Sequence, residues 1–303
     1  MNKYDFIHTG AVCPNNCEFC SQRGGKYIDL TSIVSEINDT RPPCNLYFGE
    51  GDAAGSPHVI KALKTASIWG LRRVKLKTTG TPLLQNDRLM ELVHAGILLY
   101  EIDILGPDAK THDDIAGRSG AYSDACRAIR SIKQVRPRGF QINELFLFLS
   151  VPVFGGNIEH VSAITKEIIK YRPDRVVYKY AGNADYRDSI SAIGACIPKL
   201  LDAGIWPVLS GFPFCVVGGL EYHCQEIYDR QVVPAIGESC GKCVFSRVCC
   251  GMEEELGRTY LEPVLEHKYA DEINKIADME TILLSGKHSI RAPGHRVDES
   301  TIS

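Results

Sequence analysis

Strand and helix patterns alternate six times through the first two thirds of this 303-residue chain. Short β-rich runs near Phe6 and at 44–48, 73–79, 97–105, 140–150 and 175–180 are each followed by a helical pattern, within 29–40, 56–69, 83–95, 120–135, 157–168 and 189–203. Two parallel strands need a long crossover between them, so strict alternation predicts an α/β fold with a parallel sheet. Functional side chains are then expected at the carboxyl ends of the strands.

The composition argues against several classes of partner. The formal charge is −3 and the pI is near 6.3, which gives no basic field for nucleic acid. No apolar run approaches the length of a membrane span, and the first residues lack the apolar segment of a signal peptide. We therefore expect a cytoplasmic protein without a nucleic-acid or membrane partner. In the reducing cytosol, its twelve cysteines favour metal binding over disulfides.

Three of these cysteines, Cys13, Cys17 and Cys20, lie within eight residues directly after the first predicted strand. Three thiolates on so short a loop can converge on one soft metal centre, and the missing fourth ligand leaves a position for a small molecule. A closed zinc site would normally use a fourth Cys or His nearby. Zinc or a purely structural cluster is the alternative.

The spacing C-x3-C-x2-C, with Phe19 before the third Cys, resembles the signature of the radical S-adenosylmethionine (AdoMet) enzymes. The resemblance implies a [4Fe–4S] cluster on the three cysteines, AdoMet bound to its fourth iron, and Phe19 at the cofactor. It also implies a partial (β/α)6 TIM-like barrel, open on one side, over about residues 4–210.

A second segment resembles the same family. Its members carry a Gly-Gly-Glu-Pro-like stretch at the end of the second strand, which binds the AdoMet amino group through backbone carbonyls and the Glu. Gly49, Glu50, Gly51 and Asp52 follow the second predicted strand, with Glu50 in the matching place and the last two residues departing from the pattern. The alternative is a tight turn between strand and helix.

The fourth predicted strand carries Glu101 and Asp103 on one face, because side chains alternate with a period of two. Carboxylates buried without partners are costly, so we expect both to face the mouth of the barrel. In related enzymes a polar residue near Asp103 contacts the ribose or methionyl part of AdoMet, although that place more often carries Ser.

Other polar residues near strand ends are weaker candidates. Thr78, Thr79 and Asn143, on the third and fifth predicted strands, could bind the cofactor or make satisfied hydrogen bonds in a polar layer. His112 and Arg118 fall on the loop after the fourth strand, where a solvated role and a functional role are both open.

After residue 205 the alternation stops and cysteines cluster again. Cys240-x2-Cys243-x5-Cys249 resembles the central motif of the SPASM and twitch extensions, which hold auxiliary [4Fe–4S] clusters beside the barrel. Position 253 is Glu rather than Cys, so we expect one auxiliary cluster, and the resemblance implies Cys215, Cys240, Cys243 and Cys249 as its ligands. A zinc ribbon on the same cysteines is the alternative.

The predicted domains are therefore a core barrel at 1–210, an auxiliary-cluster domain at 211–265, and a helix with a tail at 266–303. Cys44, Cys126 and Cys196 lie within predicted elements and are expected in the core. Only twelve residues precede Cys13, so we expect no N-terminal peptide-recognition domain.

The resemblance implies reductive cleavage of AdoMet to a 5′-deoxyadenosyl radical that abstracts hydrogen from a substrate, with flavodoxin or ferredoxin as the reductant. The expected substrate is a peptide or protein side chain. The alternatives are oxidation or epimerisation of a small metabolite, and a non-enzymatic iron–sulfur or zinc protein. Cys224, left over between the cluster ligands, is predicted as a catalytic hydrogen donor, with a ligand role and an inert role left open.

Overall fold

Seven parallel strands form one sheet, in which each strand pairs with the next along the chain. The computed structural model describes residues 4–21, 24–40, 44–66, 71–138, 143–227, 238–246, 248–251, 264 and 266–273. The strands are β1 Tyr4–His8, β2 Cys44–Gly49, β3 Leu71–Thr78, β4 Leu99–Asp103, β5 Phe146–Val153, β6 Arg175–Tyr180 and β7 Trp206–Ser210.

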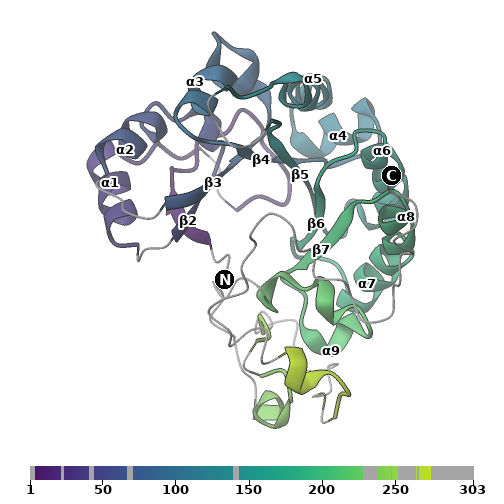
Figure 1. The fold of residues 1–303 in the computed structure, drawn as a ribbon. Coiled ribbons are helices and arrows are strands. Elements are labelled where there is room, and N and C mark those ends of the chain that lie inside the picture. Colours follow the sequence, from purple (N-terminus) through teal and green to yellow (C-terminus); the bar gives the residue numbers. More distant parts are fainter. Residues whose placement is uncertain are drawn as a thin grey trace, which may run out of the picture.

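The sheet curls into an open half-barrel whose outer side is covered by helices (Figure 1). Strands β1 and β7 form its two edges, and the segment that carries α9 lies beside β7 (Figure 1). This arrangement confirms the predicted α/β partial barrel. The helices are α1 Leu30–Asn38, α2 Val59–Thr65, α3 Arg88–His94, α4 Ala109–Ala116, α5 Ala121–Gln134, α6 Val161–Ile169, α7 Tyr186–Gly194, α8 Ile197–Asp202 and α9 Phe214–Val217.

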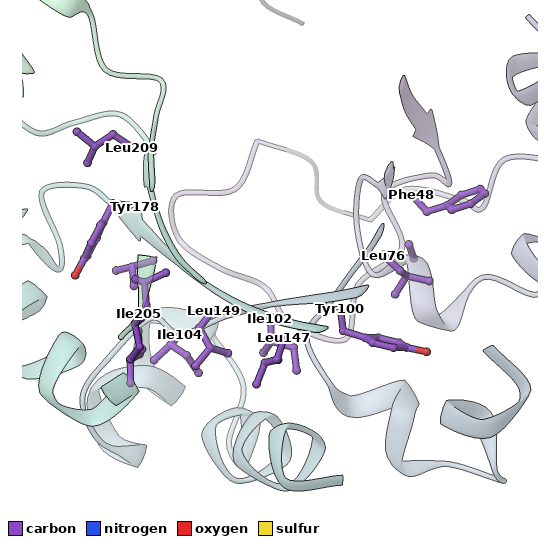
Figure 2. Close-up of a cluster of buried hydrophobic side chains, with 14 of the residues drawn as sticks. Phe48, Leu76, Tyr100, Ile102, Ile104, Leu147, Leu149, Tyr178, Ile205 and Leu209 are labelled. Carbon is purple, nitrogen blue, oxygen red and sulfur yellow. The ribbon is translucent and has the colours of Figure 1, made fainter. Parts of the chain in front are cut away.

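The two faces of the sheet differ in chemistry, because successive side chains of a strand point to opposite sides. Apolar residues such as Phe48, Leu76, Ile102 and Leu149 are fully buried on the side of the helices (Figure 2). Residues one position along each strand line the concave side instead, and there the middle of the sheet is charged. The main core therefore lies between sheet and helices, which leaves the concave face for a site.

Two polar residues near the starts of helices behave differently. Asp29 caps α1, accepting a hydrogen bond from the Ser32 N–H at 3.0 Å. Asn157 makes no cap. Its buried amide instead donates to the carbonyls of Leu105 (3.3 Å) and Pro152 (2.7 Å). Asn157 thus ties together the loops that follow β4 and β5.

Several boundaries differ from the sequence predictions. A seventh strand, β7, continues the sheet where the alternation was expected to stop. Strand β5 begins at Phe146 rather than 140, so Asn143 is an exposed residue before the strand. His112 lies on α4, not on a loop, and the helix predicted at 189–203 is divided into α7 and α8.

The predicted C-terminal divisions fall largely outside the described residues. Within 211–265 the structure describes 211–227, 238–246, 248–251 and 264, and beyond it only 266–273, of which 270–273 are helical. The domain limits at 210 and 265 stay predictions. Among the described residues, no helix combines the length and apolarity needed to cross a bilayer.

Replacing Leu149 by Ala should lower the free energy of unfolding by about 2–5 kcal/mol, because the side chain is fully buried between β5 and the helices. Met90→Ala on α3, where the side chain is 37% exposed, is the control and should change it by less than about 0.5 kcal/mol. Urea unfolding followed by circular dichroism measures both. Equal effects would contradict this placement of the core.

Candidate functional site

The three cysteines of the N-terminal motif lie on the loop that follows β1, at the carboxyl edge of the sheet. This loop is bonded to the end of α4: the Asn16 N–H donates to the Ala116 carbonyl (2.8 Å) and the Glu18 N–H to the Ile115 carbonyl (3.2 Å). Gly117 lies so close to the loop that a Cβ there would meet the Asn16 carbonyl oxygen at 2.8 Å. The loop is therefore held by backbone contacts that leave its thiols half-buried.

Arg118 adds side-chain bonds to the same junction. Its guanidinium donates to the Asn15 carboxamide (2.8 Å), to the Thr81 hydroxyl (2.8 Å) and to the Asp124 carboxylate (3.0 Å). One residue thus connects the cysteine loop to the turn after β3 and to α5. The structure assigns Arg118 a positioning role, which resolves the alternatives that the sequence left open.

The thiols of Cys13, Cys17 and Cys20 are close enough to influence one another electrostatically. The pKa of Cys13 is raised to about 11 and that of Cys17 to about 12. Burial is the main cause of both shifts, and the neighbouring thiols contribute to them. Among the described residues, no three Cys, His, Asp or Glu side chains are placed to hold a single metal ion. In an iron–sulfur cube each thiolate binds a different iron, so the donor set of three neighbouring thiols fits such a cluster.

Segment 49–52 lies directly against the cysteine loop. Gly51 has φ +56°, and a Cβ there would meet the Val12 carbonyl oxygen at 2.5 Å, so only glycine fits. The Gly49 carbonyl accepts from both the N–H (3.2 Å) and the hydroxyl (2.8 Å) of Thr9. Glu50 is half-buried, and its carboxylate makes no hydrogen bond or ion pair with the described residues. The Glu50 carboxylate is therefore left for a ligand.

Asp52 acts within the protein. Its buried carboxylate accepts from the Thr79 N–H (2.9 Å) and hydroxyl (2.5 Å), and its own N–H donates to the Val12 carbonyl (2.7 Å). Thr78 faces away from the concave side, and its hydroxyl accepts from the Gly80 N–H at 3.0 Å. These contacts indicate that Asp52 and both threonines shape the turns around the site, while the buried Asp52 Oδ1 has no hydrogen-bond partner among the described residues.

The concave face holds a charged layer. The Glu101 carboxylate is 1% exposed and forms ion pairs with the ammonium groups of Lys75 (3.1 Å) and Lys179, and it accepts from the Tyr47 hydroxyl at 3.1 Å. Burial raises the pKa of Glu101, but the nearby ammonium groups, Lys179 first, outweigh it and hold the pKa well below its usual range. Glu101 is therefore ionised.

A second pair lies one layer nearer the cysteine loop. Lys77 and Asp103 form an ion pair at 3.1 Å, and both influence the pKa of Cys17, the carboxylate raising it and the ammonium lowering it. Asp103 and Glu101 share one face as predicted. Asp103 Oδ1 and the hydroxyl of the neighbouring Ser150 are buried, and neither has a hydrogen-bond partner among the described residues.

The lysines were not among the residues predicted from the sequence. A usable signal existed, since Lys75 and Lys77 alternate along β3 with the same period as Glu101 and Asp103 along β4. Lys179 on β6 had no such pointer, because its pairing with β4 residues crosses the intervening β5.

Three other candidates have mainly structural surroundings. Phe19 packs on Phe154, with ring centroids 4.9 Å apart, and so anchors the cysteine loop. His112 is buried and accepts from the Leu105 N–H (3.3 Å); burial lowers its pKa to about 4, so it is neutral. Asn143 precedes β5, at the end of the strand opposite the cysteine loop. The structure does not bring Asn143 to the site.

The four cysteines predicted as auxiliary ligands come together beside β7. The pKa of Cys215 is raised to about 11, mainly by burial. The thiols of Cys249, Cys243 and Cys240 contribute to this shift, so all four sulfurs lie within electrostatic range of one another. Cys249 also accepts from the Phe214 N–H at 3.4 Å. These thiols fit a second cluster.

Cys250 and Cys224 adjoin this group. The Cys250 thiol donates to Cys249 and lowers the pKa of Cys249 to about 6. Cys224 pairs with Leu209 at the end of the sheet, and its side chain is fully buried in the main core. A substrate cannot reach a sulfur in that position, which argues against the predicted role of Cys224 as a hydrogen donor. The ligand and inert roles are compatible with its surroundings.

Arg118→Gln should loosen the cysteine loop, because it removes charge-assisted bonds to Asn15, Thr81 and Asp124. We expect the amides of Asn16 and Glu18 to exchange hydrogen several-fold faster than in the wild type, measured by mass spectrometry. Arg127→Gln is the matched control. Arg127 is 59% exposed, and its ion pair with Asp124 is long, at 3.8 Å, and therefore weak. Unchanged exchange in Arg118→Gln would refute the positioning role.

No family model matches the chain. It is 31% identical over 126 residues to the AdoMet-dependent heme synthase of Oleidesulfovibrio alaskensis, a match that covers 42% of this chain and 31% of that protein. The chain thus matches less than a third of this curated relative's length.

The fold is similar to crystal structures of SuiB from Streptococcus suis. SuiB bound to the precursor peptide SuiA matches with a TM-score of 0.54 at 10% identity, over 89% of this chain and 64% of SuiB. SuiB bound to S-adenosylmethionine matches with a TM-score of 0.52 at 11% identity, over 69% and 51%. The sequence match and the parallel half-barrel fold support the resemblance of this chain to the radical AdoMet enzymes.

Proposed function

We propose that the chain binds a [4Fe–4S] cluster through Cys13, Cys17 and Cys20 and uses it to cleave AdoMet reductively. The observation that carries the proposal is the loop itself: three mutually interacting thiols at the carboxyl end of β1, bonded to α4. Three thiolates leave one iron of the cluster open for a ligand.

AdoMet is proposed as that ligand, since it is bound in the SuiB crystal structure and named in the heme synthase relative. The half-buried Glu50 carboxylate, beside the cysteine loop, suits the AdoMet ammonium group. Asp103 Oδ1 and the Ser150 hydroxyl are buried polar atoms without partners among the described residues, and they suit the ribose hydroxyls. Ligand bonds to these atoms would offset the cost of burying them.

When bound, the cluster would supply the electron that cleaves the AdoMet sulfonium and gives a 5′-deoxyadenosyl radical able to abstract hydrogen. The chain's own residues orient and shield the reaction. Asn157 holds the loops after β4 and β5 in place, and the apolar cluster of Leu99, Phe148, Val177 and Val208 closes the concave side below the charged layer.

A second [4Fe–4S] cluster is proposed on Cys215, Cys240, Cys243 and Cys249, in a SPASM- or twitch-like domain. Four thiolates would close the site, which suits electron transfer or substrate docking. Flavodoxin or ferredoxin is the proposed reductant.

The proposed substrate is a peptide or protein side chain, supported by the SuiB structure that holds the precursor peptide SuiA. A small metabolite is the second candidate, because the curated relative is named as a heme synthase.

The first test is formation of 5′-deoxyadenosine from AdoMet by anaerobically reconstituted protein reduced with dithionite. The wild type should form it, and Cys17→Ala should not, because the cluster loses a ligand. Cys126→Ala is the matched control, since this buried thiol lies near Tyr171 and outside both cysteine groups. Equal amounts of 5′-deoxyadenosine from the wild type and from Cys17→Ala would refute the enzymatic proposal.

Metal content tests the two cluster assignments separately. We expect about eight irons per chain, and loss of about four in the Cys13/Cys17/Cys20 triple Ala variant. Zinc in place of the second four irons would show that the C-terminal cysteines form a zinc ribbon. About twelve irons would mean a third cluster involving Cys224 and Cys250. Inductively coupled plasma mass spectrometry measures both metals.

A further inference from the structure

The charged layer on the concave face carries more cations than anions. Three ammonium groups, on Lys75, Lys77 and Lys179, share two carboxylates, on Glu101 and Asp103. Despite burial, the nearby carboxylates raise the pKa of Lys77 and Lys179, so both stay protonated near neutral pH. Counted over these five described side chains alone, the layer carries a net charge of +1.

An uncompensated charge in a protein interior is costly unless an ion of opposite sign accompanies it. The proposed cofactors together do not supply that ion, because the single net negative charge of an oxidised [4Fe–4S] cluster on three thiolates is offset by the single net positive charge of AdoMet. Of the described acids at this edge of the sheet, Asp52 bonds to Thr79, and Glu50 is assigned to the AdoMet ammonium group. The missing anion is thus expected from a further ligand.

The accessible part of the layer points to where that ligand binds. Lys75 and Glu101 are 7% and 1% exposed, whereas the side chains of Lys77 and Lys179 are 29% and 24% exposed. Each of these two ammonium groups has three N–H donors and one carboxylate partner, Asp103 for Lys77 and Glu101 for Lys179. The two ammonium groups also repel each other electrostatically, so an anion between them is favoured on both sides.

This position is next to the proposed cofactor. Lys77 and Asp103 lie at the carboxyl ends of β3 and β4, the same edge of the sheet from which the cysteine loop leaves β1. A ligand on the two ammonium groups would therefore lie between the charged layer and the radical source. That is the location a substrate needs.

We propose that Lys77 and Lys179 bind a carboxylate of the substrate and so select acidic substrates. The proposal rests on the proposed function, and it narrows the substrate to a carboxylate-bearing molecule, such as a peptide with an acidic side chain. Lys75 and Glu101 position Lys179 from below.

The test is a calorimetric titration of the reconstituted, AdoMet-bound protein with propionate and with its uncharged isostere propionamide. Propionate should bind and propionamide should not. Lys77→Gln and Lys179→Gln should each weaken propionate binding about tenfold, the effect of losing a charge-assisted hydrogen bond. Lys170→Gln is the surface control, with a side chain 62% exposed, and should bind as the wild type does.

Two further variants separate a binding role from a folding role. Lys179→Arg and Lys77→Arg keep the charge and should retain binding within a few-fold. Loss of propionate binding in both arginine variants, as in the glutamine variants, would show general disruption and overturn the proposal. Equal binding of propionate and propionamide would also overturn it.

AdoMet affinity, measured in the same variants, distinguishes the source of the carboxylate. It should stay within about twofold of the wild type. A loss of AdoMet affinity with unchanged propionate binding would assign the lysines to AdoMet's own carboxylate and refute the substrate role. The 5′-deoxyadenosine assay on wild type tests the proposed function independently, because anion binding does not need AdoMet cleavage.

Discussion

The buried carboxylate of Glu101 is the contact on which the concave side of this protein depends. It joins β4 to β3 through Lys75, to β6 through Lys179 and to β2 through Tyr47. A buried ion pair is not a simple gain in stability, because desolvation opposes the attraction, but losing one partner leaves an uncompensated charge. Glu101 therefore holds the four strands at one curvature, because removing one of its partners is energetically costly. The lysines above it are thereby fixed in position.

Much of the fold could be predicted from the strand and helix alternation, and the errors have physical causes. Strand β7 was missed because it contains Pro207, which removes a ladder donor. The structure accommodates it because β7 is an edge strand, and the described residues add only an isolated bridge, from Leu209 to Cys224, on its other side. Pro152 is tolerated near the end of β5 for a related reason. The pairing with β4 ends at Ser150, so Pro152 pairs with Lys179 of β6 only.

The candidate site was less accessible to sequence reasoning than the fold. The cysteine spacing and segment 49–52 are local patterns, and the structure places them side by side. The contact between Lys179 and Glu101 depends instead on how far the sheet curls between β4 and β6, and no local pattern encodes curvature. Likewise, the sequence position of Arg118 gave no indication of its hydrogen bond to Asn15, which is 103 residues earlier in the chain.

Two glycines, Gly51 and Gly117, lie directly against the backbone of the cysteine loop. A side chain at Gly51 would press on the Val12 carbonyl, and one at Gly117 would press on the Asn16 carbonyl. Both glycines also have positive φ, so even alanine would be strained there. In a random mutagenesis library selected for activity, positions 51 and 117 would therefore be as intolerant as the cysteines. Such a screen would report as essential two residues that have no side chain. They are needed because they set the width of the slot that the loop occupies.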